Sequence, residues 1–119
     1  MPAPLRILVI EDEMIIAMLL EDTLAELGHQ VAGVAMRVPQ AMELAETVEA
    51  DLAILDINLD GRKSFPVAQA LADRGIKVVF ASGYGAAGLE PPFLDAIVIR
   101  KPFEPSDIRK ALQQAMAPR

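Results

Sequence analysis

The chain has 119 residues, 53% of them hydrophobic and 24% charged, a composition that predicts one compact domain and excludes a disordered tail. No apolar run reaches the ~18–20 residues of a membrane span, nothing resembles a signal peptide, and cysteine is absent, so we expect a cytoplasmic protein. Acidic residues outnumber basic ones 17 to 11, and this balance, without a basic cluster, argues against direct binding to nucleic acid.

Short aliphatic runs alternate with segments of helical periodicity. The runs are typical of strands covered on both faces, and Gly28 and Gly75 are suitable ends for the helices before them. In chain order, the sequence predicts a strand at Leu5–Ile10, a helix at Met14–Leu27, a strand at His29–Val34, a helix at Val38–Val48, a strand at Asp51–Leu55, a helix from a Ser64 cap to about Asp73, strands at Lys77–Phe80 and Ala96–Ile99, and a closing helix at Pro105–Ala117. This alternation predicts an α/β fold, a doubly wound five-stranded parallel sheet with helices on both faces.

The connection between the fourth and fifth expected strands departs from this pattern. Residues 82–92 contain three glycines and a Pro-Pro pair, both of which disfavour a regular helix. We therefore expect the fourth helix to be short or partly disordered, with at most a short helix near Ala86–Leu89.

Polar side chains follow the expected strands at the carboxyl edge of the sheet, where sites form in open parallel sheets. They are Glu11-Asp12-Glu13 after the first strand, Asp56-Ile57-Asn58 after the third, Ser82 after the fourth and Lys101-Pro102 after the fifth. Singly, each has an ordinary explanation, because acidic residues such as Glu13 are favourable at helix N-termini and Asp or Ser-Gly is common in turns. Together they bring carboxylates, a hydroxyl and an ammonium to one edge, and clustered carboxylates suit Mg²⁺.

This set of residues resembles the receiver domain of bacterial response regulators (CheY-like) across essentially the whole chain. The stretches DINLDG, residues 56–61, and FASGYG, residues 80–85, are similar to the FATGUY single-domain receivers of alphaproteobacteria. The resemblance implies a flavodoxin-like strand order 2-1-3-4-5 and one receiver domain over residues 1–119 without an output domain. It also implies a switch of a two-component system that catalyses only its own phosphorylation and dephosphorylation and signals by protein contact.

The resemblance implies the following roles at the metal site. Asp56 is the nucleophile that takes a phosphoryl group from a histidine kinase or phosphotransfer protein. Asp12 and Asp56 bind Mg²⁺ through carboxylate oxygens, Glu11 acts through water, and Asn58 supplies its backbone carbonyl.

Three further residues receive roles by the same resemblance. Lys101 neutralises charge on the transferring phosphoryl group, Ser82 hydrogen-bonds the group once it is on Asp56, and the peptide bond before Pro102 is cis. Receivers commonly place an aromatic residue three positions before this lysine, but Val98 stands there. Tyr84, the one tyrosine of the chain, is the alternative candidate for a switch residue, and its other explanation is an aromatic ring that only covers the loop. Ser82 and Glu11 also depart from the more usual Thr and Asp.

The first expected helix offers a surface for a partner. Four apolar residues recur at spacings of four, four and three, so they share one face that should cover the sheet. They are Ile16, Leu20, Leu24 and Leu27. Met14 and Met18 fall on the opposite face near the site edge, and we expect them to contribute to docking of the kinase, since Met suits an adaptable surface. The alternative is scattered apolar surface residues.

Other functions remain open at this point. A phosphate sink for a kinase fits the same residues. A phosphatase of the haloacid dehalogenase type also uses an Asp after a parallel strand, but it requires a second acid two residues later, where Asn58 stands. An interaction module without phosphorylation is disfavoured by the complete set of site residues. The kinase and the downstream protein partner are not identified by the sequence.

Overall fold

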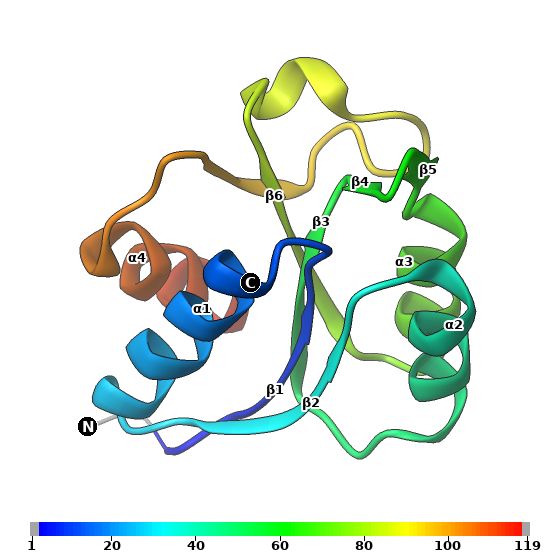
Figure 1. Cartoon of the computed structure of the whole chain (residues 1–119). Helices are drawn as coiled ribbons and strands as arrows, with labels where there is room; N and C mark the ends of the chain where they lie inside the picture. The colour runs from blue at the N-terminus through cyan, green and yellow to red at the C-terminus, as the bar shows by residue number, and fades with distance from the viewer. Residues whose placement is uncertain (1–2, 118–119) are drawn as a thin grey trace.

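Figure 1 shows the computed structural model of the chain, which describes residues 3–117. Within these residues, five parallel strands form one sheet in the order β2-β1-β3-β6-β7. The strands are β1 (Arg6–Ile10), β2 (Gln30–Ala35), β3 (Leu52–Asp56), β6 (Lys77–Ser82) and β7 (Ile97–Arg100). The α-helices are α1 (Met14–Glu26), α2 (Val38–Thr47), α3 (Phe65–Asp73) and α4 (Pro105–Met116). The expected doubly wound parallel sheet and its strand order are confirmed, because β6 and β7 are its fourth and fifth strands.

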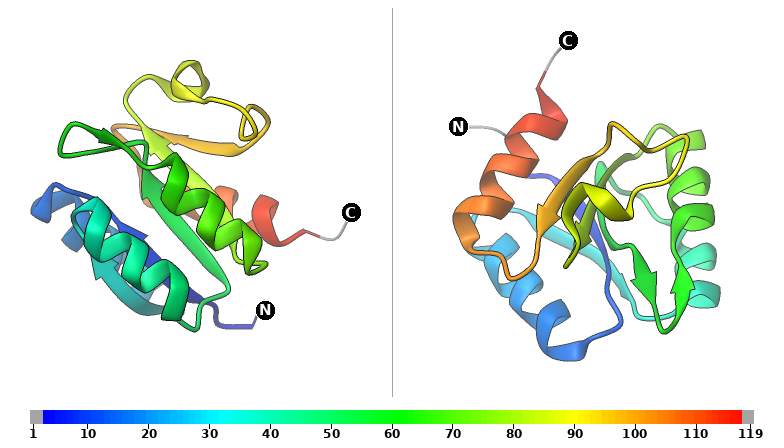
Figure 2. Two further views of the ribbon diagram at one scale, coloured as in Figure 1. Left: turned by 90° about the vertical axis from the view of Figure 1, so that its right-hand side faces the viewer. Right: turned by 90° about the horizontal axis from the view of Figure 1, so that it is seen from above.

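The helices cover both faces of the sheet, as Figures 1 and 2 show: α1 and α4 lie on one face and α2 and α3 on the other. Successive side chains of a strand point to opposite faces, so each strand contributes to two cores. In β1, Ile7 and Val9 pack toward α1 and α4, whereas Leu8 and Ile10 pack toward α2 and α3. This double coverage explains the near-continuous aliphatic runs of the central strands. Within residues 3–117, no helix is long and apolar enough to cross a membrane.

The register of the strands brings the polar residues at their ends to one level. Ile10 pairs with Leu55, so the residues that follow them, Glu11 and Asp56, are neighbours. On the other side of β3, Asp56 pairs with Ala81 of β6, and Ser82 pairs with Arg100 of β7. Lys101 follows immediately, and its backbone N–H donates to the carbonyl of Ser82 at 2.9 Å. The aliphatic runs therefore end together and leave their polar neighbours at one edge.

The glycines predicted to end helices do so at the ends of α1 and α3. Gly28 has φ +88°, and the backbone N–H of His29 donates to the carbonyl of Leu24 at 2.9 Å. Gly75 has φ +79° and is followed by the same bond pattern at Ile76. These are Schellman motifs, which favour glycine because other residues are strained at positive φ. The expected Ser64 cap differs: Ser64 occupies the N-cap position of α3, but its hydroxyl makes no capping hydrogen bond.

The connection between β6 and β7 contains a single short helix, η1 (Gly85–Gly88), a turn of 3₁₀ helix. This confirms that the fourth helix is short. The rest of the connection is anchored by Leu89, which is buried, and by Phe93. The ring of Phe93 lies 5.5 Å from that of Phe80 in β6 and 6.1 Å from that of Phe65 in α3, measured between centroids. The segment thus packs on the core through a few large side chains despite its glycines.

A two-stranded hairpin, absent from the sequence-based expectations, follows β3. Its strands are β4 (Asn58–Leu59) and β5 (Arg62–Lys63), which pair antiparallel, and its tip is Asp60-Gly61. Both tip residues have positive φ, 51° and 83°, as a two-residue turn of type I′ requires, and Asp-Gly is a favoured sequence for it. Leu59 is fully buried and fixes the hairpin to the core.

Candidate functional site

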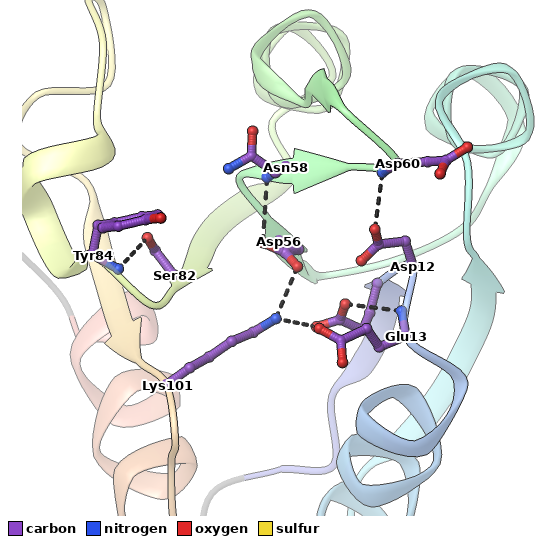
Figure 3. Close-up of polar contacts among 9 residues, drawn as sticks. Asp12, Glu13, Asp56, Asn58, Asp60, Ser82, Tyr84 and Lys101 are labelled. Atoms are coloured by element: carbon purple, nitrogen blue, oxygen red, sulfur yellow. Dashed lines mark hydrogen bonds and ion pairs between the residues drawn. The ribbon is translucent and has the colours of Figure 1, made fainter.

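Figure 3 shows the polar side chains that meet at the carboxyl edge of the sheet. Glu11 and Asp12 follow β1, Asp56 is the last residue of β3, Ser82 is the last residue of β6, and Lys101 follows β7. One cluster contains Glu11, Asp12, Asp56 and Lys101. The Lys101 side chain reaches across the ends of the strands to Glu11 and Asp56. The structure therefore brings together residues that are up to 90 positions apart in the chain.

Lys101 is the centre of the cluster. Its Nζ lies 2.6 Å from Oε1 of Glu11 and 2.8 Å from Oδ2 of Asp56. The Glu11 side chain is only 1% exposed, and that of Lys101 is 16% exposed. Burial raises the pKa of Glu11 to about 7, although the hydrogen bond from Lys101 acts in the opposite direction. Burial alone lowers the pKa of Lys101, but its hydrogen bonds to Asp56 and Glu11 outweigh this and raise it above its ordinary value.

Asp12 lies on the hairpin side of the cluster. Its Oδ2 accepts a hydrogen bond of 2.9 Å from the backbone N–H of Asp60, at the tip of the β4–β5 hairpin. Burial opposes ionisation of Asp12, but this hydrogen bond contributes to a net lowering of its pKa below the ordinary value. The lowered pKa favours the ionised form of Asp12. Sequence reasoning did not identify Asp60, although the Asp-Gly turn signal was present.

The three carboxylates fit a small divalent cation. Glu11, Asp12 and Asp56 can each offer one oxygen such that these oxygens lie within 4.8 Å of one another. Ligand oxygens on Mg²⁺ are at most about 4.2 Å apart, since Mg–O distances are about 2.0–2.1 Å. Small movements of the three side chains would therefore bring their oxygens within the reach of one such cation. A carboxylate oxygen that accepts one hydrogen bond keeps a second lone pair for a cation. Asn58 lies beside the cluster, with its backbone N–H 3.3 Å from Oδ1 of Asp56. The ligand roles of Glu11, Asp12, Asp56 and the Asn58 carbonyl all remain predictions.

Ser82 and Tyr84 form a second polar contact at this edge. Ser82 is 4% exposed, and its Oγ accepts a hydrogen bond of 3.0 Å from the backbone N–H of Tyr84. Tyr84 itself is 76% exposed. Gly88, the last residue of η1, lies close to the hydroxyl, because a Cβ built on it would be 3.6 Å from Ser82 Oγ. The short helix therefore rests against the serine.

Val98 and Pro102 are the two remaining predicted positions, in and just after β7. Val98 pairs with Phe80 across β6 and β7 and is half-buried, so a small aliphatic side chain occupies the position of the missing aromatic. The Lys101-Pro102 peptide bond is cis, and so is Pro91-Pro92. Glu13, the N-cap residue of α1, makes no side-chain cap; its backbone N–H donates to Glu11 at 3.1 Å.

The start of α1 exposes apolar side chains beside the site. Met14 and Met18 are 63% and 54% exposed. Ile15 and Leu19, which the sequence-based argument did not single out, are exposed as well, at 82% and 48%. These four residues, called the α1 patch below, form one apolar surface at the N-terminal half of the helix.

Comparison with known proteins identifies the family. Residues 7–113 match the response regulator receiver domain. The chain belongs to this family. The receiver is 32% identical over 118 residues to the transcriptional regulatory protein PdtaR of Mycobacterium tuberculosis, a match that covers 96% of this chain and 58% of PdtaR. It is 37% identical over 119 residues to the phyllosphere-induced regulator PhyR of Methylorubrum extorquens, covering 93% of this chain and 43% of PhyR. The receiver thus spans about half the length of these two relatives.

Among solved structures, the receiver is similar to SdrG from Sphingomonas melonis, with a TM-score of 0.86 and 42% identity over 98% of this chain and 100% of that chain. A second structure of SdrG, described as its BeF₃-activated conformation, has a TM-score of 0.81 at the same identity and covers 94% of this chain and 96% of that one. The resemblance to receivers inferred from the strand-end residues is confirmed by these matches.

The central position of Lys101 leads to a prediction about stability. Without Mg²⁺, Lys101→Met leaves two partly or fully buried carboxylates without a cation, so it should lower the free energy of unfolding by roughly 3 kcal/mol. Glu11→Gln should cost much less in the Lys101→Met background than in the wild type, because the pair is already broken. Urea denaturation in the presence of a chelator measures all four proteins. Arg100→Met, which removes an exposed charge next to Lys101, is the control. Additive effects of the two site substitutions would contradict a coupled pair.

Proposed function

We propose that this receiver is a phosphorylation-dependent switch that accepts a phosphoryl group on Asp56 from a histidine kinase or phosphotransfer protein, with Mg²⁺ as cofactor. The observation that carries the proposal is the cluster in which Lys101 bridges Glu11 and Asp56 while Asp12 lies beside them. A structural ion pair does not require a third carboxylate, whereas phosphoryl transfer requires a nucleophile, a cation site and a fixed positive charge at one place.

Asp56 is the residue that can act as nucleophile. Its side chain is 12% exposed and lies at the end of a central strand, so a donor can reach it while the backbone stays fixed. A carboxylate oxygen of Asp56 attacks phosphorus, and the P–O bond forms as the P–N bond of a phosphohistidine donor breaks. The electron pair of that bond leaves with the imidazole, which takes up a proton. Lys101, already within hydrogen-bond distance of Asp56, can donate to a phosphoryl oxygen.

The metal site is assigned to the residues around Asp56. Asp12 and Asp56 would hold Mg²⁺ directly, with the backbone carbonyl of Asn58, and a cation bound there would supply positive charge beside the transferring phosphoryl oxygens. The Glu11 carboxylate is engaged by Lys101 and by the backbone N–H of Glu13, which supports a less direct role for Glu11 than for Asp12.

The α1 patch is proposed as the docking surface for the phosphodonor protein. Its four apolar residues adjoin the Asp12 side of the site, so a helix packed on them can present a phosphohistidine to Asp56. Exposed Met side chains are adaptable and suit such a transient contact.

Tyr84 is proposed as the residue whose environment changes with phosphorylation. Val98 is too small to serve as a rotating aromatic, whereas the backbone of Tyr84 is already bonded to Ser82. A phosphoryl group on Asp56 offers new acceptors to the Ser82 hydroxyl, and any movement of Ser82 is passed to residues 84–88. The similar receiver SdrG has a structure described as its BeF₃-activated conformation, so a receiver like this one can have an activated state. The output is then a contact with a downstream protein.

Replacing Asp56 tests the function. We expect Asp56→Asn to abolish formation of a covalent phosphoryl adduct with a small-molecule phosphodonor and Mg²⁺, because an amide is not a competent nucleophile. Intact-mass spectrometry with the acid-stable, base-labile signature of an acyl phosphate is the measurement, and Asp22→Asn, an exposed acid on α1, is the control. A specific adduct on Asp56→Asn would overturn the assignment. Steady release of phosphate from many phosphomonoesters would instead indicate a phosphatase.

Charge on the α1 patch tests docking. Met14→Glu with Met18→Glu should slow phosphoryl transfer from the cognate kinase at least about tenfold, since two charges oppose desolvation of an apolar contact. Phosphorylation by the small-molecule donor should be unchanged. Met116→Glu, at the far end of α4, is the control. If the donor reaction slows equally, the substitutions have damaged the site and the docking role fails.

The switch role of Tyr84 can be followed by its own fluorescence. The chain has one tyrosine and no tryptophan, so intrinsic emission reports this ring alone. Beryllofluoride with Mg²⁺ should reduce quenching of the emission by acrylamide, because the ring moves from its exposed position toward protein. Ser82→Ala should remove most of this change while Asp56 still takes up phosphoryl groups. An unchanged response in Ser82→Ala would show that the signal bypasses the serine.

A further inference from the structure

The β4–β5 hairpin touches the carboxylate cluster through its backbone. The N–H of Asp60 donates to Oδ2 of Asp12 at 2.9 Å, as Figure 3 shows. Asp60 has φ +51°, a left-handed conformation that only a few residue types tolerate, and Gly61 continues it at +83°. This conformation directs the amide of the tip at Asp12.

The side chain of Asp60 has a partner of its own. Its carboxylate forms an ion pair with Arg37, the residue immediately before α2. Arg37 lies outside the cluster and is not among the residues that could hold the cation. The tip of the hairpin is therefore held between two points, Asp12 through its amide and Arg37 through its carboxylate. The buried Leu59 fixes the base of the same hairpin.

We propose that the hairpin tip positions Asp12 for the cation and that Arg37 keeps the tip in place. This inference rests on the proposed function, since it concerns the metal site of that proposal. A hydrogen bond to one carboxylate oxygen sets the orientation of the group and leaves the other oxygen for the metal. Removal of such an outer hydrogen bond typically lowers metal affinity about 10–100-fold. Arg37 is a positioning residue, because it acts on Asp12 only through Asp60.

The exposure of the Arg37–Asp60 ion pair limits how much its loss can change Mg²⁺ affinity. The side chains of Arg37 and Asp60 are 65% and 67% exposed, and exposed ion pairs are weak. Losing Arg37 should therefore loosen the hairpin tip without releasing it fully, and we expect the affinity for Mg²⁺ to fall about threefold.

The charge of Arg37 alone predicts the opposite change in Mg²⁺ affinity, so a titration can distinguish the two explanations. Arg37 is a positive charge near a cation site, so its removal without any positioning role should strengthen Mg²⁺ binding slightly. Arg62, on the same hairpin, is exposed and forms no ion pair within residues 3–117. Arg62→Ala removes an equal positive charge, from the hairpin itself, without breaking an ion pair to Asp60, and is the control for Arg37→Ala.

The experiment has two arms on the full chain. Calorimetric titration with Mg²⁺ compares the wild type, Arg37→Ala and Arg62→Ala. Amide hydrogen exchange in metal-free protein measures protection of the Asp60 N–H. We expect Arg37→Ala to bind Mg²⁺ about threefold more weakly and to exchange the Asp60 amide several-fold faster, while Arg62→Ala binds equally or more tightly with unchanged exchange.

The outcomes distinguish failure of the positioning role from failure of the metal site. If the wild type and Arg62→Ala bind Mg²⁺ and Arg37→Ala binds as tightly as they do, the positioning role is wrong and the proposed function stands. If the wild type binds no Mg²⁺, the metal site itself is wrong, and the inference fails with it. In an Asp60→Gly background, which tolerates the same φ and leaves Arg37 no side-chain acceptor at position 60, Arg37→Ala should have no further effect on exchange of the residue 60 amide. A further loss of protection there would show that Arg37 acts through another contact.

Discussion

Three carboxylates at one sheet edge repel one another, and the ammonium of Lys101 is the group that allows two of them to lie together. The repulsion follows directly from the register, because Ile10 pairs with Leu55 and the residues that follow them, Glu11 and Asp56, are both acidic. Water cannot screen the cluster well, since Glu11 is fully buried. Backbone amides that donate to Glu11, Asp12 and Asp56 stabilise the negative charge of the same three carboxylates.

Holding these charges together costs folding free energy, and the same arrangement makes the site sensitive to a bound cation or phosphoryl group. The charges are carried on central strands, whose side chains are buried on both faces, so the core supports positions that electrostatics alone would separate. A bound cation or a phosphoryl group changes the charge balance by one or two units at a place where the effective dielectric is low. A small chemical change can therefore shift the local structure, which is the property a switch requires.

The fold and the composition of the edge could be predicted because both depend on patterns that are local in sequence. Aliphatic runs defined the five strands within a few residues, and parallel crossovers then fixed which strand ends meet. The contact between Glu11 and Lys101 could not be predicted, since the same sequence allows a glutamate that faces water. The β4–β5 hairpin was missed because strands of two residues carry no periodicity. Phe93 was overlooked because the glycines near it suggested a loose loop, whereas its place in a cluster of three aromatic rings depends on tertiary packing.

The departures from the usual receiver pattern are connected by the short η1 helix. With one turn in place of a full helix, the segment after β6 has few backbone hydrogen bonds of its own, and its positions depend on Ser82, on Leu89 and on Phe93. Gly88 allows η1 to approach Ile57 closely, since a Cβ there would lie 3.2 Å from Ile57 Cδ1, and Ile57 is the residue after Asp56. The residue that follows Asp56 in the chain thus lies against the short helix, as Ser82 does. A small side chain at Val98 is consistent with the proposed switch, in which movement at the site reaches the surface through the backbone of residues 82–88 without a rotating aromatic ring.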